Sequence, residues 1–434
     1  FLSSQSYCQS ARKQKGSAVY KGVRKTHLQK SLRLTTAMAY FILFVCLVAG
    51  SLAEDPEINM NVSQIIQHWG YPVEEYDVTT SDGYILTVQR IPHGRNDKKT
   101  DVKRPVVFLQ HGLLGSSSQW ITNLPNQSLG YVLADRGFDV WLGNSRGNAY
   151  ALKHERLSTD SDEFWDFSFD EFAKYDIPAS LEFAMTCSKQ KRISYIGHSQ
   201  GTTIAFAAFS QNQTLAAKVD VFIALAPVAT VGNMKSPIKY LSYLSGGIQW
   251  LSWVFGVRDF LPSTFITRSL GRYVCEEEVG SVWCSNLMFL MCGYDKAQLN
   301  ETRLPVYVAH TPAGTSVKDV VHFAQMYKSG KFQMYDYGWR YKNRIHYGQS
   351  TPKNYDVSKI RVPVALFSAD KDWLATPKDV SLLVPKLKTL VFRKHLRSWD
   401  HLDFIWGLDA SSLIYEDIHR LLKKFKRRAK ILGV

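Results

Sequence analysis

Short hydrophobic runs, bounded by turn residues, recur along most of the chain. They cover residues 106–110, 140–142, 193–196, 221–226, 362–367 and 390–392, and the segments between them place hydrophobic residues at helical spacing. Strands that are hydrophobic on both faces and alternate with helices are typical of a parallel sheet with helices on each side. The pattern therefore predicts an α/β fold built on a mostly parallel central sheet.

Both ends of this pattern carry a further element. Residues 76–91, YDVTTSDGYILTVQRI, alternate in two stretches that meet at Asp82-Gly83, and this dipeptide favours a tight antiparallel hairpin. Near the C-terminus, hydrophobic residues at intervals of three and four predict a helix that packs on the sheet. Its inward stripe is Leu413, Ile414, Ile418, Leu421, Leu422 and Phe425, with Glu416, Asp417 and the lysines facing water.

The alternation of strands and helices stops between Pro227 and Arg361. A stretch of this length is too long for a loop inside a compact sheet, so we expect an inserted cap over residues 230–355. The core domain would then consist of residues 54–229 and 356–434. The insert is rich in aromatic residues, namely Tyr240, Tyr243, Trp250, Trp253, Phe255, Phe260 and Phe265. They are candidates for a lid, or for the insert's own core.

The net charge of +15, from 53 basic and 38 acidic residues, comes from the two ends of the chain. Residues 1–53 hold eight Lys or Arg and residues 421–434 hold six, and neither stretch has an acidic residue. The part between is nearly neutral, so no nucleic-acid partner is expected. The basic end suits a solvated helix C-terminus, with contact to an anionic surface as the alternative.

An uninterrupted hydrophobic run, AYFILFVCLVA, follows Met38 and is followed in turn by Ser51-Leu52-Ala53. The run is short for a membrane span, and the small residues suit cleavage before Glu54. We therefore interpret residues 38–53 as a signal peptide, with an uncleaved signal anchor as the alternative. Residues 1–37 are expected to be a non-structural leader or upstream read-through. Secreted and lysosomal locations both fit entry into the secretory pathway.

Entry into the secretory pathway predicts glycosylation and disulfides. Acceptor sequons for N-glycosylation begin at Asn61, Asn126, Asn212 and Asn300. Four cysteines follow the expected cleavage site, at positions 187, 275, 284 and 292. Their spacing alone leaves three complete pairings open.

The pattern G-x-S-x-G, which marks a nucleophilic serine in many α/β enzymes, occurs twice. GHSQG is centred on Ser199, follows the strand signature ISYIG and precedes the hydrophobic segment TTIAFAAF. GNSRG is centred on Ser145, and the segment NAYALK after it has no buried-helix pattern. The nucleophile requires a strand, a tight turn and a helix, so Ser199 is the candidate nucleophile and Ser145 a structural turn.

The other catalytic parts are sought where this fold places them. HGLLG follows the strand that ends at Gln110, so the backbone N–H groups of Leu113 and of Gln200 are candidate oxyanion donors. In such enzymes the acid precedes the histidine in the chain. Asp370 and Asp372 after residues 362–367 are both candidate acids. Of His395 and His401 after the last strand, His401 lies on the loop before the final helix and is the better candidate base.

From about Asn59 to the final helix, the chain resembles the acid lipases, the gastric and lysosomal family of α/β-hydrolases. The stretches that carry the resemblance are NMNVSQIIQHWGYPVEEY, DGYILTVQRIPHG, LQHGLLGSSSQW, DVWLGNSRGN, FSFDEFAKYDIPA, GHSQGTT, ALAPVA, PAGTS, KSGKFQMYD, KDWLA and DHLDFIWGLDA. The resemblance implies Ser199 as nucleophile, Asp372 rather than Asp370 as acid and His401 as base. It also implies Leu113 and Gln200 as oxyanion donors, a Cys275–Cys284 disulfide and a free thiol at Cys292.

The expected function is hydrolysis of carboxylic esters of neutral lipids, triacylglycerols or cholesteryl esters, at a lipid–water interface through an acyl-enzyme. The mechanism requires no cofactor or metal. A lid in the insert would contact a membrane or micelle, because a permanently exposed apolar patch promotes aggregation. The alternatives are a catalytically silent lipid-binding homologue and an esterase or peptidase that acts on soluble substrates.

Overall fold

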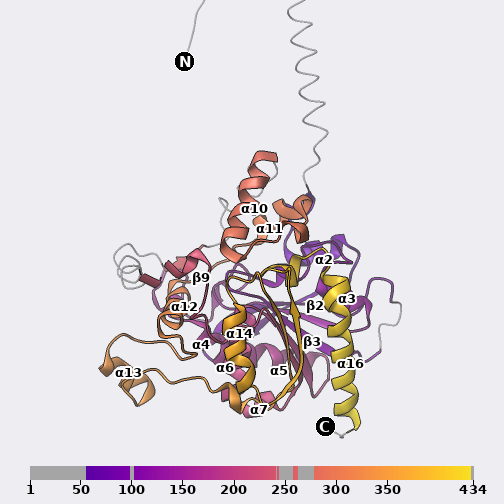
Figure 1. Ribbon diagram of the computed structural model, residues 1–434. Coiled ribbons are helices and arrows are strands. Elements are labelled where there is room, and N and C mark those ends of the chain that lie inside the picture. The colour runs from indigo at the N-terminus through magenta and orange to yellow at the C-terminus, as the bar shows by residue number, and fades with distance from the viewer. Residues whose placement is uncertain (1–54, 98–101, 241, 244–257, 262–277, 432–434) are drawn as a thin grey trace, which may run out of the picture. The chain divides into compact units, whose positions relative to one another are not determined.

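The computed structural model describes residues 55–97, 102–240, 242–243, 258–261 and 278–431, and its large sheet confirms the predicted α/β class (Figure 1). The order of the strands is β1-β2-β4-β3-β6-β7-β10-β11, with β5 paired to β2. Pairing is parallel from β4 through β11 and antiparallel among β1, β2, β4 and β5. The strands are β1 (Glu74–Thr79), β2 (Tyr84–Ile91), β3 (Val106–Gln110), β4 (Asp139–Gly143), β5 (Lys153–His154), β6 (Ile193–His198), β7 (Val219–Leu225), β10 (Val364–Ala369) and β11 (Leu390–Leu396).

The burial of the strands explains which ones the hydrophobic pattern located well. Every residue of β3, β4, β6, β7 and β10 is buried, as expected for central parallel strands. The edge strand β11 instead alternates half-buried and exposed residues. The hydrophobic run 390–392 therefore marked only its beginning, and His395 lies within it. The predicted hairpin is present, and Gly83 adopts φ +98° at its turn.

Helices cover both faces of the sheet. They are α2 (Val62–His68), α3 (Leu129–Asp135), α4 (Phe169–Glu171), α5 (Ile177–Cys187), α6 (Gln200–Gln211), α7 (Gln213–Ala216), α14 (Pro377–Leu383), α15 (Asp403–Trp406) and α16 (Glu416–Ile431). In Figure 1, α3 and α16 lie on one side of strands β2 and β3, and α5 and α6 lie on the other. Arg136, which caps α3, donates to the backbone carbonyl of Tyr415 just before α16.

Two details of the predicted final helix are wrong. Leu413 is 39% exposed rather than buried, and Asp417 is 7% exposed rather than facing water. A π-helical turn over Ser411–Tyr415 precedes α16, and its wider turn brings Tyr415 to the core in place of Leu413. Asp417 is buried because Lys394 pairs with it at 2.7 Å. The rest of the predicted stripe is buried.

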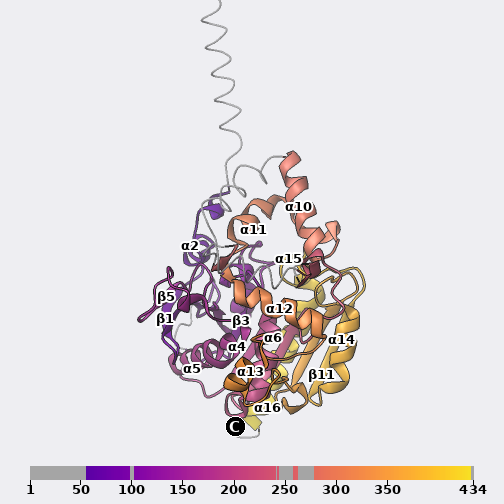
Figure 2. The same ribbon diagram turned by 90° about the vertical axis from the view of Figure 1, so that its left-hand side faces the viewer.

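Between β7 and β10 the chain leaves the large sheet. The described part of this insert contains β8 (Asp259–Phe260), α10 (Glu278–Cys292), α11 (Leu304–His310), β9 (Thr315–Ser316), α12 (Val317–Ser329) and α13 (Arg340–Tyr347). Both views place α10 and α11 beyond one end of the sheet (Figures 1 and 2). Trp250, Trp253, Phe255 and Phe265 lie outside the described residues. Tyr240 and Tyr243 are exposed, whereas Phe260 packs against Val317, Val321 and Tyr335 in the insert's own core.

Polar contacts join the insert to the core at several points. Arg303, 4% exposed, pairs with Glu57 at 2.5 Å and donates to the carbonyl of Thr122 at 2.6 Å. Tyr307 stacks on Trp406 with ring centroids 4.4 Å apart. The N–H of Ala313 donates to the carbonyl of Leu114 at 2.7 Å. The insert is therefore attached to three separate parts of the core.

The predicted leader and signal peptide, residues 1–53, lie outside the described residues. Among the helices that the structure describes, none combines the length and the hydropathy needed to cross a membrane. The sequon asparagines Asn61, Asn126 and Asn212 are exposed and Asn300 is partly exposed, so none of the four acceptor side chains is buried.

Candidate active site

Ser199 occupies a sharp turn between β6 and α6. Its backbone has φ 52° and ψ −119°, a left-handed conformation that is costly for a residue with a side chain. The flanking glycines permit the turn. A Cβ on Gly197 would lie 2.6 Å from the carbonyl oxygen of Gly201, and one on Gly201 would lie 2.4 Å from that of Gln110. The G-x-S-x-G spacing thus reflects direct backbone contact between β3, β6 and α6.

Asp372 and His401 form a buried pair on the loops after β10 and β11. The Nδ1–H of His401 donates to both carboxylate oxygens of Asp372, at 2.9 and 3.0 Å, and both residues are 2% exposed or less. Backbone N–H groups of Leu374 and Ala375 also donate to Asp372, so its carboxyl group is held in place against His401. With Nδ1 protonated, the Nε2 of neutral His401 carries the lone pair that a general base needs.

His198 connects this pair to the serine turn. Its Nε2–H donates to the backbone carbonyl of His401 at 2.9 Å, and the two imidazole centroids are 4.9 Å apart. Burial lowers the pKa of His198 to about 3, so its ring stays neutral. In the described part of the chain no hydrogen bond joins the side chains of Ser199 and His401, and such contacts commonly tighten only when substrate binds.

The other two candidates lie together at a different place. Asp370 accepts a hydrogen bond from Nε2 of His395 at 2.8 Å, and both side chains are at least about one-third exposed. Nδ1 of His395 contacts the hydroxyl of Ser368 at 2.9 Å. The structure therefore brings Asp372, and not Asp370, against His401.

The two candidate oxyanion donors share one arrangement. Each belongs to a peptide whose carbonyl oxygen is held by more than one donor. Gly112 O accepts from Gly115 N–H at 3.0 Å and from His111 Nδ1–H at 2.8 Å. Ser199 O accepts from Thr202 N–H at 2.8 Å, Thr202 Oγ at 2.6 Å and Thr203 N–H at 3.3 Å. No described residue accepts a hydrogen bond from the N–H of Leu113 or of Gln200. Backbone N–H groups without a protein acceptor are uncommon in a buried setting, so both remain available to a ligand.

The second G-x-S-x-G sequence, GNSRG, supports the HGLLG loop that carries Leu113. Ser145, 4% exposed, accepts from Gln110 Nε2 at 3.0 Å, and its N–H donates to Nε2 of His111 at 3.0 Å. This contact leaves the proton of His111 on Nδ1, where it reaches Gly112 O. Burial lowers the pKa of His111 to about 4, which keeps the ring neutral.

Arg146 of the same sequence is 1% exposed and pairs with Asp82 and Asp176, each at 2.6 Å. Its guanidinium also lies 3.8 Å from the ring centroid of Tyr84. These contacts explain why GNSRG occupies a turn without exposing its serine.

A pair of buried carboxyl groups borders the histidine. The backbone N–H of Asp400 donates to Asp403 Oδ2 at 2.6 Å, and the N–H groups of Leu402 and Asp403 donate to Asp400. Burial, with the nearby charge of Asp372, raises the pKa of Asp400 to about 7. Burial, with the nearby charge of Asp400, raises the pKa of Asp403 to about 9.

Two cysteine assignments can be compared with the structure. Cys284 is disulfide-bonded, and its expected partner Cys275 lies outside the described residues. Cys292 is a free thiol, as the resemblance implied, and so is Cys187. In the described part of the chain, no group of three His, Cys, Asp or Glu side chains is arranged to hold a metal ion.

Comparison with known proteins shows the family of the chain. A family model of the α/β hydrolase fold matches residues 105–408, and one of the partial α/β-hydrolase lipase region matches residues 62–124. Gastric triacylglycerol lipase of Rattus norvegicus is 53% identical over 364 residues, which cover 84% of this chain and 92% of that protein. The chain belongs to the acid lipase family of α/β-hydrolases.

Other acid lipase relatives match over similar lengths. Lysosomal acid lipase/cholesteryl ester hydrolase of Homo sapiens is 48% identical over 399 residues, covering 90% of this chain and all of that protein. Among solved structures, Lip1 of Acinetobacter baumannii aligns with a TM-score of 0.51 at 14% identity, over 87% of this chain and 99% of that one, which shows the shared fold.

Sequence reasoning missed the roles of two histidines in this acid lipase site. His111 and His198 lie inside HGLLG and GHSQG, but their partners are 34 and 203 residues away along the chain. The one signal for them in the sequence was their position, since His111 directly precedes Gly112 in HGLLG and His198 directly precedes Ser199 in GHSQG.

Proposed function

We propose that the protein hydrolyses carboxylic esters of neutral lipids through an acyl-enzyme on Ser199. The observation that carries the proposal is the buried Asp372–His401 pair beside a strained serine turn, with two backbone N–H groups available next to that serine. Family membership supports the same reaction, since relatives about 50% identical are gastric triacylglycerol lipases and lysosomal acid lipases.

In the proposed mechanism, Nε2 of His401 takes the proton of Ser199 as its oxygen attacks the ester carbonyl. Asp372 keeps the histidine in the Nδ1–H tautomer and stabilises the imidazolium that forms. The N–H groups of Leu113 and Gln200 bind the developing oxyanion. His401 then returns the proton to the leaving alcohol, and the same histidine activates the water that hydrolyses the acyl-enzyme.

Triacylglycerols and cholesteryl esters are the substrates that the relatives' names suggest, and each relative acts on the substrates in its own name. The insert would supply a lid that contacts a micelle or membrane surface. Deleting residues 250–265 should reduce hydrolysis of emulsified triolein while a soluble short-chain ester is still cleaved. Unchanged activity on triolein would contradict the lid role. Gastric and lysosomal relatives also support delivery through the secretory pathway.

Substitution of the two serines tests the chemistry. Ser199→Ala should lower the kcat for tributyrin by about 10⁶-fold, to background, because the nucleophile is lost. Ser145→Ala should keep hydrolysis, because it removes only an acceptor for Gln110. The folded state of both variants is checked by thermal unfolding. Hydrolysis by folded Ser199→Ala would refute the assignment. Absence of hydrolysis in the wild type as well as in the variant would favour a silent lipid-binding homologue.

A further inference from the structure

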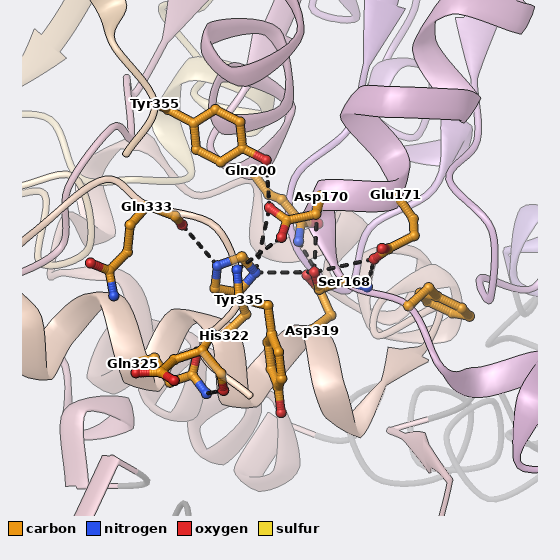
Figure 3. A network of polar contacts seen from close by, with 12 residues as sticks. Ser168, Asp170, Glu171, Gln200, Asp319, His322, Gln325, Gln333, Tyr335 and Tyr355 are labelled. Atoms are coloured by element: carbon orange, nitrogen blue, oxygen red, sulfur yellow. Dashed lines mark hydrogen bonds and ion pairs between the residues drawn. The ribbon is translucent and has the colours of Figure 1, made fainter. Parts of the chain in front are cut away.

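The insert segment from Ala313 to Asp319 contacts Gln200, one candidate oxyanion donor, and the neighbour in the chain of Leu113, the other. The N–H of Ala313 donates to the carbonyl of Leu114, the residue after Leu113, at 2.7 Å. At the other end of the segment, Asp319 Oδ2 accepts from the side-chain Nε2 of Gln200 at 2.6 Å. Figure 3 shows this contact as part of a larger polar network around α12. One short stretch of the insert thus reaches both halves of the site.

The Asp319–Gln200 contact acts on the peptide that carries the donor. The carbonyl of the Ser199–Gln200 peptide is held by Thr202. The other end of that peptide is the N–H of Gln200, and its direction depends on where the Cα of Gln200 lies. The Gln200 side chain is 2% exposed, and Asp319 accepts the one hydrogen bond that it makes to another described side chain. Anchoring the side chain therefore restricts the peptide plane.

Asp319 is itself held in place. It is fully buried at the third position of α12, where Ser316 caps its N–H, and Thr315 Oγ donates to the same carboxyl oxygen at 3.0 Å. The helix is anchored to the core, because Ser316 Oγ donates to the carbonyl of Phe167 at 2.5 Å. His322 also accepts from Ser168 Oγ at 3.0 Å and donates to the carbonyl of Gln333 at 2.9 Å.

Burial raises the pKa of Asp319 to about 7, although hydrogen bonds from Gln200 and Thr315 oppose the change. A neutral carboxyl group still presents a carbonyl oxygen to both donors. Asparagine presents the same oxygen in nearly the same shape, and it is therefore the conservative substitute.

Resting on the function proposed above, we propose that Asp319 is a positioning residue of the insert that holds the side chain of Gln200 and so aims its backbone N–H at the oxyanion. The insert then contributes to the chemical step, separately from any lid that admits lipid.

The test measures kcat and KM for p-nitrophenyl butyrate below its solubility limit, which removes interfacial effects, with active sites titrated by a serine-directed phosphonate. Asp319→Ala should lower kcat by up to about 100-fold, the cost of misplacing a reacting group by about 1 Å, with little change in KM. Asp319→Asn should stay within about threefold of wild type, because the acceptor oxygen is kept. The inhibition constant of butylboronic acid, whose serine adduct places an oxygen at the donors, should rise in parallel with the fall in kcat.

Asp379 provides a matched control. It is 3% exposed, occupies the third position of α14 after the cap Thr376, and accepts from Thr230 and Asn233 rather than from a residue of the site. Asp379→Ala should lower stability and leave kcat per titrated site within about threefold of wild type, because no oxyanion peptide moves. An equal loss of kcat in the Asp379 variant would show a general effect of buried aspartate and overturn the proposal.

Gln200→Ala supplies an independent measurement should Asp319→Ala fail to fold. It removes the anchor and keeps the backbone N–H, so it should show the same loss of kcat, and combining it with Asp319→Ala should add nothing. Wild-type kcat in either single variant would overturn the role of Asp319. It would leave the proposed hydrolase intact as long as Ser199→Ala remains inactive, so the two proposals fail separately.

Discussion

Replacing Gly201 by alanine tests whether direct backbone contact shapes the serine turn. The new Cβ would lie 2.4 Å from the carbonyl oxygen of Gln110 and 2.8 Å from that of His111, where ordinary contact begins at 3.4 Å. Both neighbours are backbone atoms at the end of β3 and cannot rotate away. The start of α6 must therefore move by about 1 Å, the difference between the ordinary and the imposed separation.

That displacement has two measurable consequences. Overpacking a tightly packed contact costs about 1–3 kcal/mol of unfolding free energy. The same movement carries Ser199 and the N–H of Gln200 away from the position of the reacting carbonyl, and a misplacement of about 1 Å costs about 100-fold in rate. We expect kcat for a soluble butyrate ester to fall by about that factor, while urea unfolding shows a folded but less stable protein.

The matched control is Ile204→Val, which also lies in α6 and is fully buried. It removes one methylene, at a cost of about 0.5–1.5 kcal/mol, without pressing on β3. Its kcat should stay within about twofold of wild type at similar stability. If Gly201→Ala kept wild-type kcat, the helix and the strand could separate without moving the turn, and the steric explanation of the second glycine would be wrong.

Three further outcomes follow from other contacts. Arg146→Met should lower the unfolding free energy by about 3–5 kcal/mol in urea titrations, because two carboxylates lose their buried partner; an effect below about 1 kcal/mol would contradict that role. Asp372→Asn should lower kcat by about 10⁴-fold by favouring the wrong tautomer of His401, whereas Asp370→Asn should change it less than about threefold, and comparable losses would reopen the choice. Asp403 has a pKa raised to about 9 in the folded state against about 3.9 unfolded; the folded protein keeps a proton that the unfolded chain releases, so stability falls as pH rises between these values. Unfolding free energy should accordingly fall less steeply from pH 5 to pH 8 in Asp403→Asn than in wild type, and equal slopes would argue against a neutral Asp403.

The parts of the fold that sequence could predict are those with a local cause. Central strands are hydrophobic at every position, the hairpin has its Asp-Gly turn, and Ser199 has the strand and helix that its turn requires. The edge strand β11 and the wide turn before α16 were predicted less well. In β11, exposed residues alternate with half-buried ones, so the run of hydrophobic residues is short. Before α16, the π-helical turn adds one residue to the helical spacing, and this shifts the buried face.

The candidate site shows the same division. Spacing and chain order led to Ser199 and His401, but Asp370 and Asp372 are two residues apart on one loop and have the same chemistry. The choice between them depends on which carboxylate the backbone turns toward His401. The neutral state of His111 and the contact of Asp319 with Gln200 depend on partners distant in the chain, and only the folded arrangement reveals them.

The attachments of the insert constrain any attempt to graft it onto another hydrolase. A chimaera that carried only the insert helices would leave the guanidinium of Arg303 without Glu57 and the carbonyl of Thr122, and the ring of Tyr307 without Trp406. The recipient would then need its own counterparts of the Glu57 carboxylate, the Thr122 carbonyl and the Trp406 ring. Exchanging substrate preference between relatives is therefore better attempted by transferring the insert together with these docking residues.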